Sequence, residues 1–205
     1  DISPPISKDL AVFPGDVGFS RTVAMSYPQK DPYELSSIKT TLHIGAHADA
    51  PSHFHPKGVS IEKCDLQSYF GPCQVISVSL AKSDRICPHH LKDVAIKAPR
   101  VLFRTRSFSD PYQWTNDFNS LSANLIDHLA KYQVVLVGID TPSIDLAEDK
   151  HLEAHQAIYK NNIAVLEGLN LESITDGIYG LVAFPLKIMN AEASPVRAVL
   201  LREKK

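Results

Sequence analysis

The alternation of apolar and polar side chains predicts most of the elements of this chain. From Ser36 to Ile44 apolar residues alternate with Thr and His, a period of two that is typical of a strand with one buried face. The run from Val134 to Ile139 is apolar almost throughout, which predicts a strand buried on both faces. Other runs rich in β-branched residues predict strands at 19–25, 74–80, 101–105, 163–166, 179–185 and 196–201.

Helical signals are fewer and lie between the predicted strands. Ser122 is a suitable N-cap for a helix with apolar residues on one face, and Pro88 can open a shorter helix. A third helix is predicted from Lys150 to Lys160. Strands outnumber helices, and they occur both in adjacent pairs and in alternation with helices. The pattern therefore predicts an α/β fold with a mixed β-sheet core flanked by helices.

Composition narrows the class of protein. The chain has 205 residues, of which 44% are hydrophobic and 21% charged, and no linker or low-complexity stretch divides it, so we expect one domain over residues 1–205. A net charge of -2 offers no basic stripe, which argues against nucleic acid as a partner. No apolar run is long enough to cross a membrane. Three cysteines cannot all pair within one chain, and the start lacks the features of a signal peptide, which favours a cytoplasmic location.

The densest concentration of chemical groups begins at His43. His43, His47 and Asp49 are three potential metal ligands within a short segment, and His47 and Asp49 share one face if that segment is extended. Gly45 lets the backbone turn sharply or bulge between them. An isolated histidine is usually an ordinary surface or hydrogen-bonded residue, but this grouping predicts a metal centre. Imidazole nitrogen and carboxylate oxygen suit Zn²⁺, and also Mn²⁺ or Fe²⁺.

Further ligands for such a centre must come from later in the chain. His155, on the predicted helix, and Glu167, at the end of an apolar run and just before a glycine, are the candidates. His151 lies one helical turn before His155, but its place at the helix start favours a role facing solvent. His53 follows Pro51, whose ring restricts the backbone, and it is the residue that we expect to transfer protons.

A loop from Arg104 to Trp114 is rich in Ser and Arg and carries several aromatic side chains. Part of this loop can line a substrate cleft, and a role in the core or in a subunit contact is equally compatible with its composition. The sequence leaves this choice open.

The segment from His43 to Phe54 resembles the signature His-x-Gly-Thr-His-x-Asp-x-Pro-x-His-Phe of the bacterial kynurenine formamidases, within the metal-dependent cyclase family. It departs from that signature at Ala46, where threonine is usual. The resemblance extends along the chain, through residues 1–5, 13–16, 138–143, 154–155, 166–168 and 194–199. It implies the cyclase-like fold of the swivelling β/β/α type.

The resemblance also implies a ligand set for two Zn²⁺ ions in each subunit. His43, His47, Asp49 and Glu167 would hold the first ion. Asp49 and Glu167 would bridge to a second ion, which His155 would also bind.

The same resemblance implies an activity, the hydrolysis of N-formyl-L-kynurenine to L-kynurenine and formate in tryptophan degradation, by a metal-activated hydroxide. His53 would act as general acid and base. Phe13 stands where the family has a substrate-contacting aromatic residue, usually Trp, and it keeps an aromatic face while lacking the indole donor. A homodimer or a dimer of dimers is also implied.

Two other functions remain compatible with these residues. Another hydrolase of the same family, acting on a cyclic amide such as isatin or on a lactone, would use the same chemistry. A non-catalytic metal-binding relative would have no need of His53. A serine nucleophile is not indicated, because the chain has no Gly-x-Ser-x-Gly segment.

Overall fold

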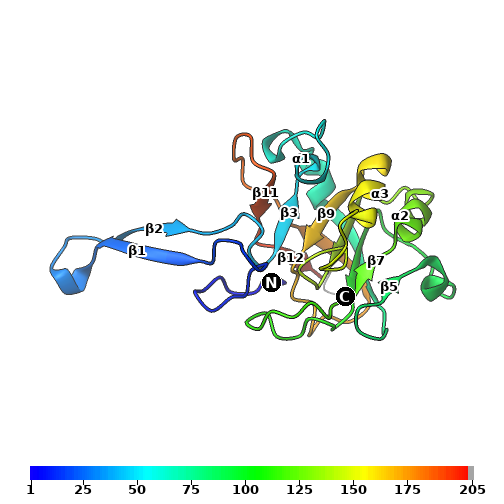
Figure 1. Ribbon diagram of the computed structural model, residues 1–205, viewed down its shortest axis with the longest axis horizontal. Coiled ribbons are helices and arrows are strands. Elements are labelled where there is room, and N and C mark those ends of the chain that lie inside the picture. Colours follow the sequence, from blue (N-terminus) through cyan, green and yellow to red (C-terminus); the bar gives the residue numbers. More distant parts are fainter. Residues whose placement is uncertain (203–205) are drawn as a thin grey trace.

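An eight-stranded mixed sheet dominates the computed structural model, which describes residues 1–202 (Figure 1). The strands are β1 Ser20–Met25, β2 Leu35–Lys39, β3 His47–Asp49, β4 Phe70–Ser77, β5 Arg85–Ile86, β6 Arg100–Arg104, β7 Ser120–Leu121, β8 Leu136–Ile139, β9 Ala164–Glu167, β10 Gly177–Val182, β11 Ala193–Pro195 and β12 Val199–Leu201. Their order in the large sheet is β11-β3-β9-β8-β6-β4-β10-β12. The four central strands β9, β8, β6 and β4 are parallel, and the outer ones pair antiparallel. The predicted α/β fold with a mixed sheet is confirmed.

The helices are short and gather mainly on one face of this sheet. They are the α-helices α1 Pro51–Phe54, α2 Ala123–Ala130 and α3 Glu153–Asn161, and the 3-10 helices η1 Tyr27–Gln29, η2 Ile61–Lys63, η3 Leu66–Tyr69 and η4 Pro88–Leu91. As predicted, the Ser122 hydroxyl accepts a hydrogen bond from the Leu125 N–H, at 3.1 Å, and so caps α2. Among residues 1–202, no helix is both long and apolar enough to span a membrane.

The central strands bury side chains on both of their faces. On β6, Val101 and Phe103 pack with α2 and α3, whereas Leu102, between them, packs into a second cluster on the opposite face. Every residue of β8 is buried, which confirms the predicted burial from Leu136 to Ile139. The strand begins two residues later than predicted, and Val135 is exposed. The parallel centre of the sheet is therefore a rigid support for the loops that follow its strands.

The predicted strand from Ser36 to Ile44 is wrong in its extent and in its burial. The strand β2 ends at Lys39, and the following residues form turns. All residues of β2 are exposed, because β1 and β2 pair only with each other in a hairpin that projects from the rest of the molecule (Figure 1). Alternation there does not reflect burial of one face within this chain.

The predicted helix from Lys150 to Lys160 begins three residues late, at Glu153. Leu152 has a left-handed backbone, with φ of 51°. The Asp149 carboxylate accepts the backbone N–H groups of His151, Leu152 and Glu153 and so organises a turn before the helix. Local hydrogen bonding therefore overrides the helical pattern of the first turn.

Candidate metal centre

The pairing of β3 with β9 brings two of the predicted ligands together. His47 is the direct antiparallel partner of Glu167, so their side chains leave the sheet on the same face. Asp49 lies two residues further along β3 and points to that face as well, whereas Ala48 between them is fully buried on the other face. The predicted extended segment with His47 and Asp49 on one side is confirmed.

His43 and His155 complete the group from outside this strand pair. Gly45, with φ of 57°, turns the chain before β3 and lets His43 fold back, so that its Nδ1 lies 2.9 Å from Asp49 Oδ1. His155 approaches from α3, and its Nε2 lies 3.3 Å from Asp49 Oδ2 and 3.4 Å from Glu167 Oε1. The five side chains predicted as ligands thus converge on one point of the fold.

The environment of these side chains fits a bound cation. His47, Asp49, His155 and Glu167 are at most 3% exposed. His47 Nε2 and Asp49 Oδ1 are both buried and make no hydrogen bond of good geometry, although Glu167 Oε2 lies 3.2 Å from the first and His43 Nδ1 lies 2.9 Å from the second. A cation between them would relieve this costly state. His47, Asp49 and Glu167 each offer one atom within 4.8 Å of the others. These nitrogen and oxygen donors suit Zn²⁺, Mn²⁺ or Fe²⁺.

Opposite charges shift the pKa values of these groups. Burial disfavours a charge on His47, but its close contact with the Glu167 carboxylate and the charge of Asp49 raise the His47 pKa to about 9. Burial likewise opposes ionisation of Asp49, and contacts with His155 and His43 nevertheless hold its pKa well below the usual range. Without a cation, protons on the histidines balance the carboxylates. Metal uptake must displace those protons, so affinity for metal falls as the pH falls.

Three further groups orient the candidate ligands. Glu167 Oε1 accepts the N–H of Ile144 at 2.7 Å, and Gly45 O lies 2.9 Å from His47 Nδ1. Asp145 Oδ2 lies 2.9 Å from His155 Nδ1. Each imidazole that donates its Nδ1 proton in this way turns Nε2 toward the carboxylates, where its lone pair would be available to a cation.

We expect Asp145→Asn to weaken metal binding by about ten- to a hundredfold, because an amide holds His155 less well than a carboxylate does. Asp145 also pairs with Arg85 at 2.9 Å, and its pKa is lowered to about 2 because its contacts, first the hydrogen bond with His155, outweigh burial. Metal titration of the metal-free protein measures the effect. Asp127→Asn is the control, since Asp127 pairs with Lys160 at the surface. An unchanged affinity in Asp145→Asn would contradict this role.

His53 lies beside the five candidate ligands and is more open to solvent. It belongs to α1, which Pro51 opens, and its side chain is 35% exposed. Its Nε2 lies 3.9 Å from Asp49 Oδ2, and its ring centroid is 4.3 Å from that of His43. Partial burial lowers the His53 pKa despite the charge of Asp49, so the ring is neutral near pH 7 and can accept a proton. This position suits proton transfer, and the role stays a prediction.

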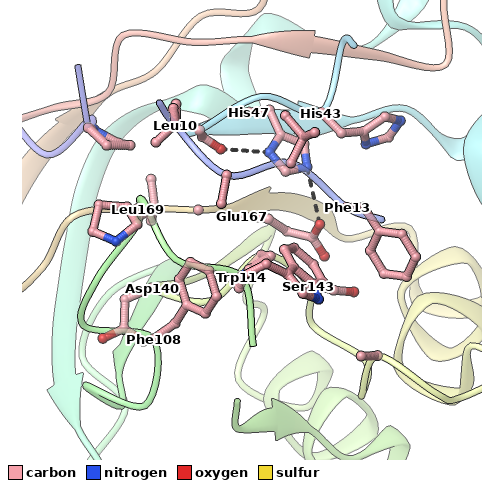
Figure 2. A pocket seen from close by; sticks show the side chains of 18 of the residues that line it. Leu10, Phe13, His43, His47, Phe108, Trp114, Asp140, Ser143, Glu167 and Leu169 are labelled. Carbon is pink, nitrogen blue, oxygen red and sulfur yellow. Dashed lines mark hydrogen bonds and ion pairs between the residues drawn. The ribbon is translucent and has the colours of Figure 1, made fainter. Parts of the chain in front are cut away.

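A cavity of about 670 Å³ opens over these residues (Figure 2). This volume is within the usual range for a small-molecule site. Phe13, the predicted substrate contact, lines the cavity and packs edge-to-face on Trp114, with ring centroids 5.0 Å apart. Phe108 also lines the cavity and lies 5.9 Å from Trp114. The aromatic loop therefore contributes to the wall of the cavity, whereas Phe103 from the preceding strand is fully buried in the core.

Several residues of the cavity were not predicted from the sequence. Leu10 and Leu169 line it without belonging to any recognisable pattern, and Ser143 lies in a segment shared with the family but was not predicted to line a site. Of the histidines set aside earlier, His151 is exposed, as predicted, and does not line the cavity.

Gly168 brings the end of β9 against the turn before β3. A Cβ at this position would lie 2.1 Å from Gly45 O, and the φ of 63° disfavours any other residue. We expect Gly168→Ala to lower the free energy of unfolding by about 3 kcal/mol, since backbone must move at both segments. Thermal or denaturant unfolding measures this loss. Gly18→Ala is the control, because no atom lies within 4 Å of its added Cβ, and equal stability of the two variants would contradict the close approach.

Comparisons with known proteins agree with the resemblance. The sequence model of the Cyclase family matches residues 1–146. The kynurenine formamidase of Bordetella pertussis is 43% identical over 201 residues, which are 98% of this chain and 96% of that protein.

Solved structures match over the whole chain as well. A potential metal-dependent hydrolase with cyclase activity superposes with a TM-score of 0.85 at 26% identity, covering 100% of this chain and 98% of that one. Isatin hydrolase A from Labrenzia aggregata, at 22% identity over 99% of this chain and 93% of its own, has a TM-score of 0.80 and supports the fold alone. On this evidence the chain belongs to the cyclase family and, within it, groups with the kynurenine formamidases.

Proposed function

We propose that this protein is an arylformamidase that hydrolyses N-formyl-L-kynurenine to L-kynurenine and formate. The observation that carries this proposal is the position of His53, a neutral and partly open imidazole, beside a buried group of metal-binding side chains in a cavity with aromatic walls. The full-length similarity to a kynurenine formamidase selects the substrate.

The substrate is an aryl formamide, so the reaction needs an activated water and a proton for the departing aniline nitrogen. A divalent cation, when bound, lowers the pKa of water and polarises the formyl oxygen. His53 accepts the proton from water and returns it to the leaving nitrogen, a role that typically contributes about a hundred- to ten-thousandfold in rate. Phe13 and Trp114 offer their faces and edges to the aromatic ring of the substrate and orient it.

The arrangement of oxygens supports two metal ions with bridging carboxylates. Asp49 Oδ1 lies beside His43 and Asp49 Oδ2 beside His155. Glu167 divides its oxygens in the same way, with Oε2 lying 3.2 Å from His47 and Oε1 lying 3.4 Å from His155. Each carboxylate thus offers one oxygen to either side. We assign Zn²⁺ to both positions, with Mn²⁺ and Fe²⁺ as alternatives, and metal analysis should find two ions per chain.

The projecting hairpin supports the proposed homodimer or dimer of dimers. A two-stranded hairpin is marginally stable alone, and this one exposes Val23, Leu35 and Ile38. Light scattering on the purified protein measures the number of subunits.

The proposed cytoplasmic location rests on the cysteines, none of which is in a disulfide.

Formate release from N-formyl-L-kynurenine, measured with metal content on the same sample, tests the proposed function. Isatin ring opening is assayed in parallel, because a preference for isatin would establish the alternative hydrolase. The low identity to isatin hydrolase, 22% against 43% to a kynurenine formamidase, does not favour that alternative. Absence of turnover on either substrate by the metal-loaded protein would indicate a non-catalytic relative.

A further inference from the structure

The proposed substrate has a charged part that the residues described so far leave without partners. N-formyl-L-kynurenine carries a formamide, an aromatic ring and, at the far end of a ketone side chain, an α-amino acid group. The candidate metal ligands and His53 serve the formamide, and the aromatic wall serves the ring. A carboxylate and an ammonium group that leave water need charged or hydrogen-bonding partners in the cavity.

Arg106 is the only lysine or arginine among the described residues that line the cavity. Its Nε lies 3.7 Å from Oε2 of Glu172, which also lines the cavity. Their side chains are 55% and 63% exposed, so the pair lies where the cavity opens to solvent. An exposed ion pair contributes little to stability, and a ligand can therefore separate its members at small cost.

The backbone of Arg106 is held in an unusual conformation. Its φ of 58° is left-handed, a conformation that is unfavourable for a residue with a Cβ. Asp140, only 8% exposed, offsets this cost, since its carboxylate accepts the N–H groups of Thr105 and Arg106, both at 2.9 Å. It also accepts the Thr105 hydroxyl at 2.7 Å. A buried carboxylate thus fixes the backbone of Arg106, just after β6, and with it the point from which the Arg106 side chain extends.

The position of Arg106 suits the far end of the substrate. Glu167 ends β9 and Arg106 follows β6, and these strands are separated by β8 alone. Two strand spacings place the ends of these strands about 10 Å apart across the sheet, and Arg106 lies two residues beyond the end of β6. In Figure 2, Asp140 and Phe108 lie across the cavity from His43 and His47, with Trp114 between the two groups. Metal-binding, aromatic and charged regions therefore follow one another in the same order as formamide, ring and amino acid in the substrate.

We propose that Arg106 and Glu172 form the binding site for the amino acid end of the substrate. The Arg106 guanidinium binds the α-carboxylate, for which its paired N–H donors are well shaped. The Glu172 carboxylate binds the α-ammonium group. This inference rests on the proposed function and explains how the protein distinguishes an amino acid substrate from other aryl formamides.

Arg106→Gly tests the proposal without straining the backbone. Glycine tolerates a φ of 58°, so the variant loses the guanidinium and should keep the fold and its thermal stability. Two substrates are compared: N-formyl-L-kynurenine and 2-acetylformanilide, which keeps the formamide, ring and ketone but ends in a methyl group. We expect kcat/KM to fall about ten- to a hundredfold for the first, mainly through KM, and less than about threefold for the second.

Product inhibition provides a readout that does not depend on turnover of the long substrate. With 2-acetylformanilide as the reporter, the inhibition constant of L-kynurenine should rise by the same factor in Arg106→Gly, while that of 2-aminoacetophenone should not change. Glu172→Gln should raise the inhibition constant of L-kynurenine less than Arg106→Gly does, because the glutamine amide oxygen still accepts a hydrogen bond. Arg197→Ala is the control, since Arg197 is 81% exposed and pairs with Asp1 outside the cavity.

Three results would overturn the proposal. If Arg106→Gly lost kcat/KM equally on the two substrates, Arg106 would shape the catalytic region. If it lost kcat/KM on neither substrate, Arg106 would not touch the substrate. Wild-type protein that hydrolyses 2-acetylformanilide but not N-formyl-L-kynurenine would refute the proposed function and this inference together. Selective loss on N-formyl-L-kynurenine supports both.

Discussion

Asp49→Ala is expected to empty the metal centre and to reduce hydrolysis to the background rate. Asp49 is the most connected of the candidate ligands, with Oδ1 lying 2.9 Å from His43 Nδ1 and Oδ2 lying 3.3 Å from His155 Nε2. Its removal takes away a negative charge and a ligand that both proposed metal positions would share. Glu167 would then be the one carboxylate left between the remaining histidines, since Asp145 contacts His155 through the other ring nitrogen. A divalent cation would lose much of its charge compensation. Metal analysis and formate release on the same preparation measure both effects.

The same substitution should not unfold the protein. The charge of Asp49 is one of the causes that raise the His47 pKa, so without Asp49 the buried histidine can lose its proton and leave no unbalanced charge. Alanine at position 49 leaves the β3 pairing intact, because the strand bonds through its backbone. Asp93→Ala, at an exposed position outside the cavity, is the matched control. A folded Asp49→Ala protein with full metal content and turnover would remove Asp49 from the ligand set.

The part of the site that could be predicted from sequence is the part in which ligands are close together in the chain. His47 and Asp49 share a face because a strand alternates, and this follows from their spacing alone. His155 and Glu167 were candidates because of their residue types, and the family resemblance joined them to the first segment. Their convergence depends on the pairing of β3 with β9 and on the docking of α3, which are long-range events without a local signal.

The residues that support the site were harder to predict. Asp145 reaches His155 through a turn, and no pattern in the sequence indicates that contact. Asp140 stood in a segment shared with the family, directly after a strand correctly predicted as buried, and a polar residue at the carboxyl end of a parallel strand is a recognisable signal. Its partner Arg106 belongs to the loop from Arg104 to Trp114. The composition of that loop did not determine its role.

The hairpin shows why the fold was predicted well at its centre and less well at its edge. The central strands are buried on both faces, so their apolar runs report their environment directly. The hairpin alternates in the same way as a buried strand, yet its two strands pair with no other strand among residues 1–202. Short elements such as β5, β7 and β11 were missed because two or three residues carry too little periodicity to recognise.

His53→Ala is expected to separate catalysis from metal binding. His53 shares the face of the cavity with His43 and Asp49, but it is the most exposed of the three and its Nε2 is 3.9 Å from the nearest Asp49 oxygen. If it moves protons, the variant keeps its metal content and loses about a hundred- to ten-thousandfold in kcat. His55→Ala is the matched control, because His55 stacks on Tyr159 at 3.7 Å and does not line the cavity.

The alternative to proton transfer is that His53 is itself a ligand, since His43, Asp49 and His53 bring donor atoms within 4.8 Å of one another. A ligand and a proton carrier differ in what their loss removes. Loss of a ligand weakens metal binding, and added metal restores part of the activity. Loss of a proton carrier leaves metal binding unchanged, and a small imidazole base supplied in solution restores part of the activity instead. Rescue of His53→Ala by imidazole at unchanged metal content supports proton transfer, whereas rescue by metal alone assigns His53 to the ligand set.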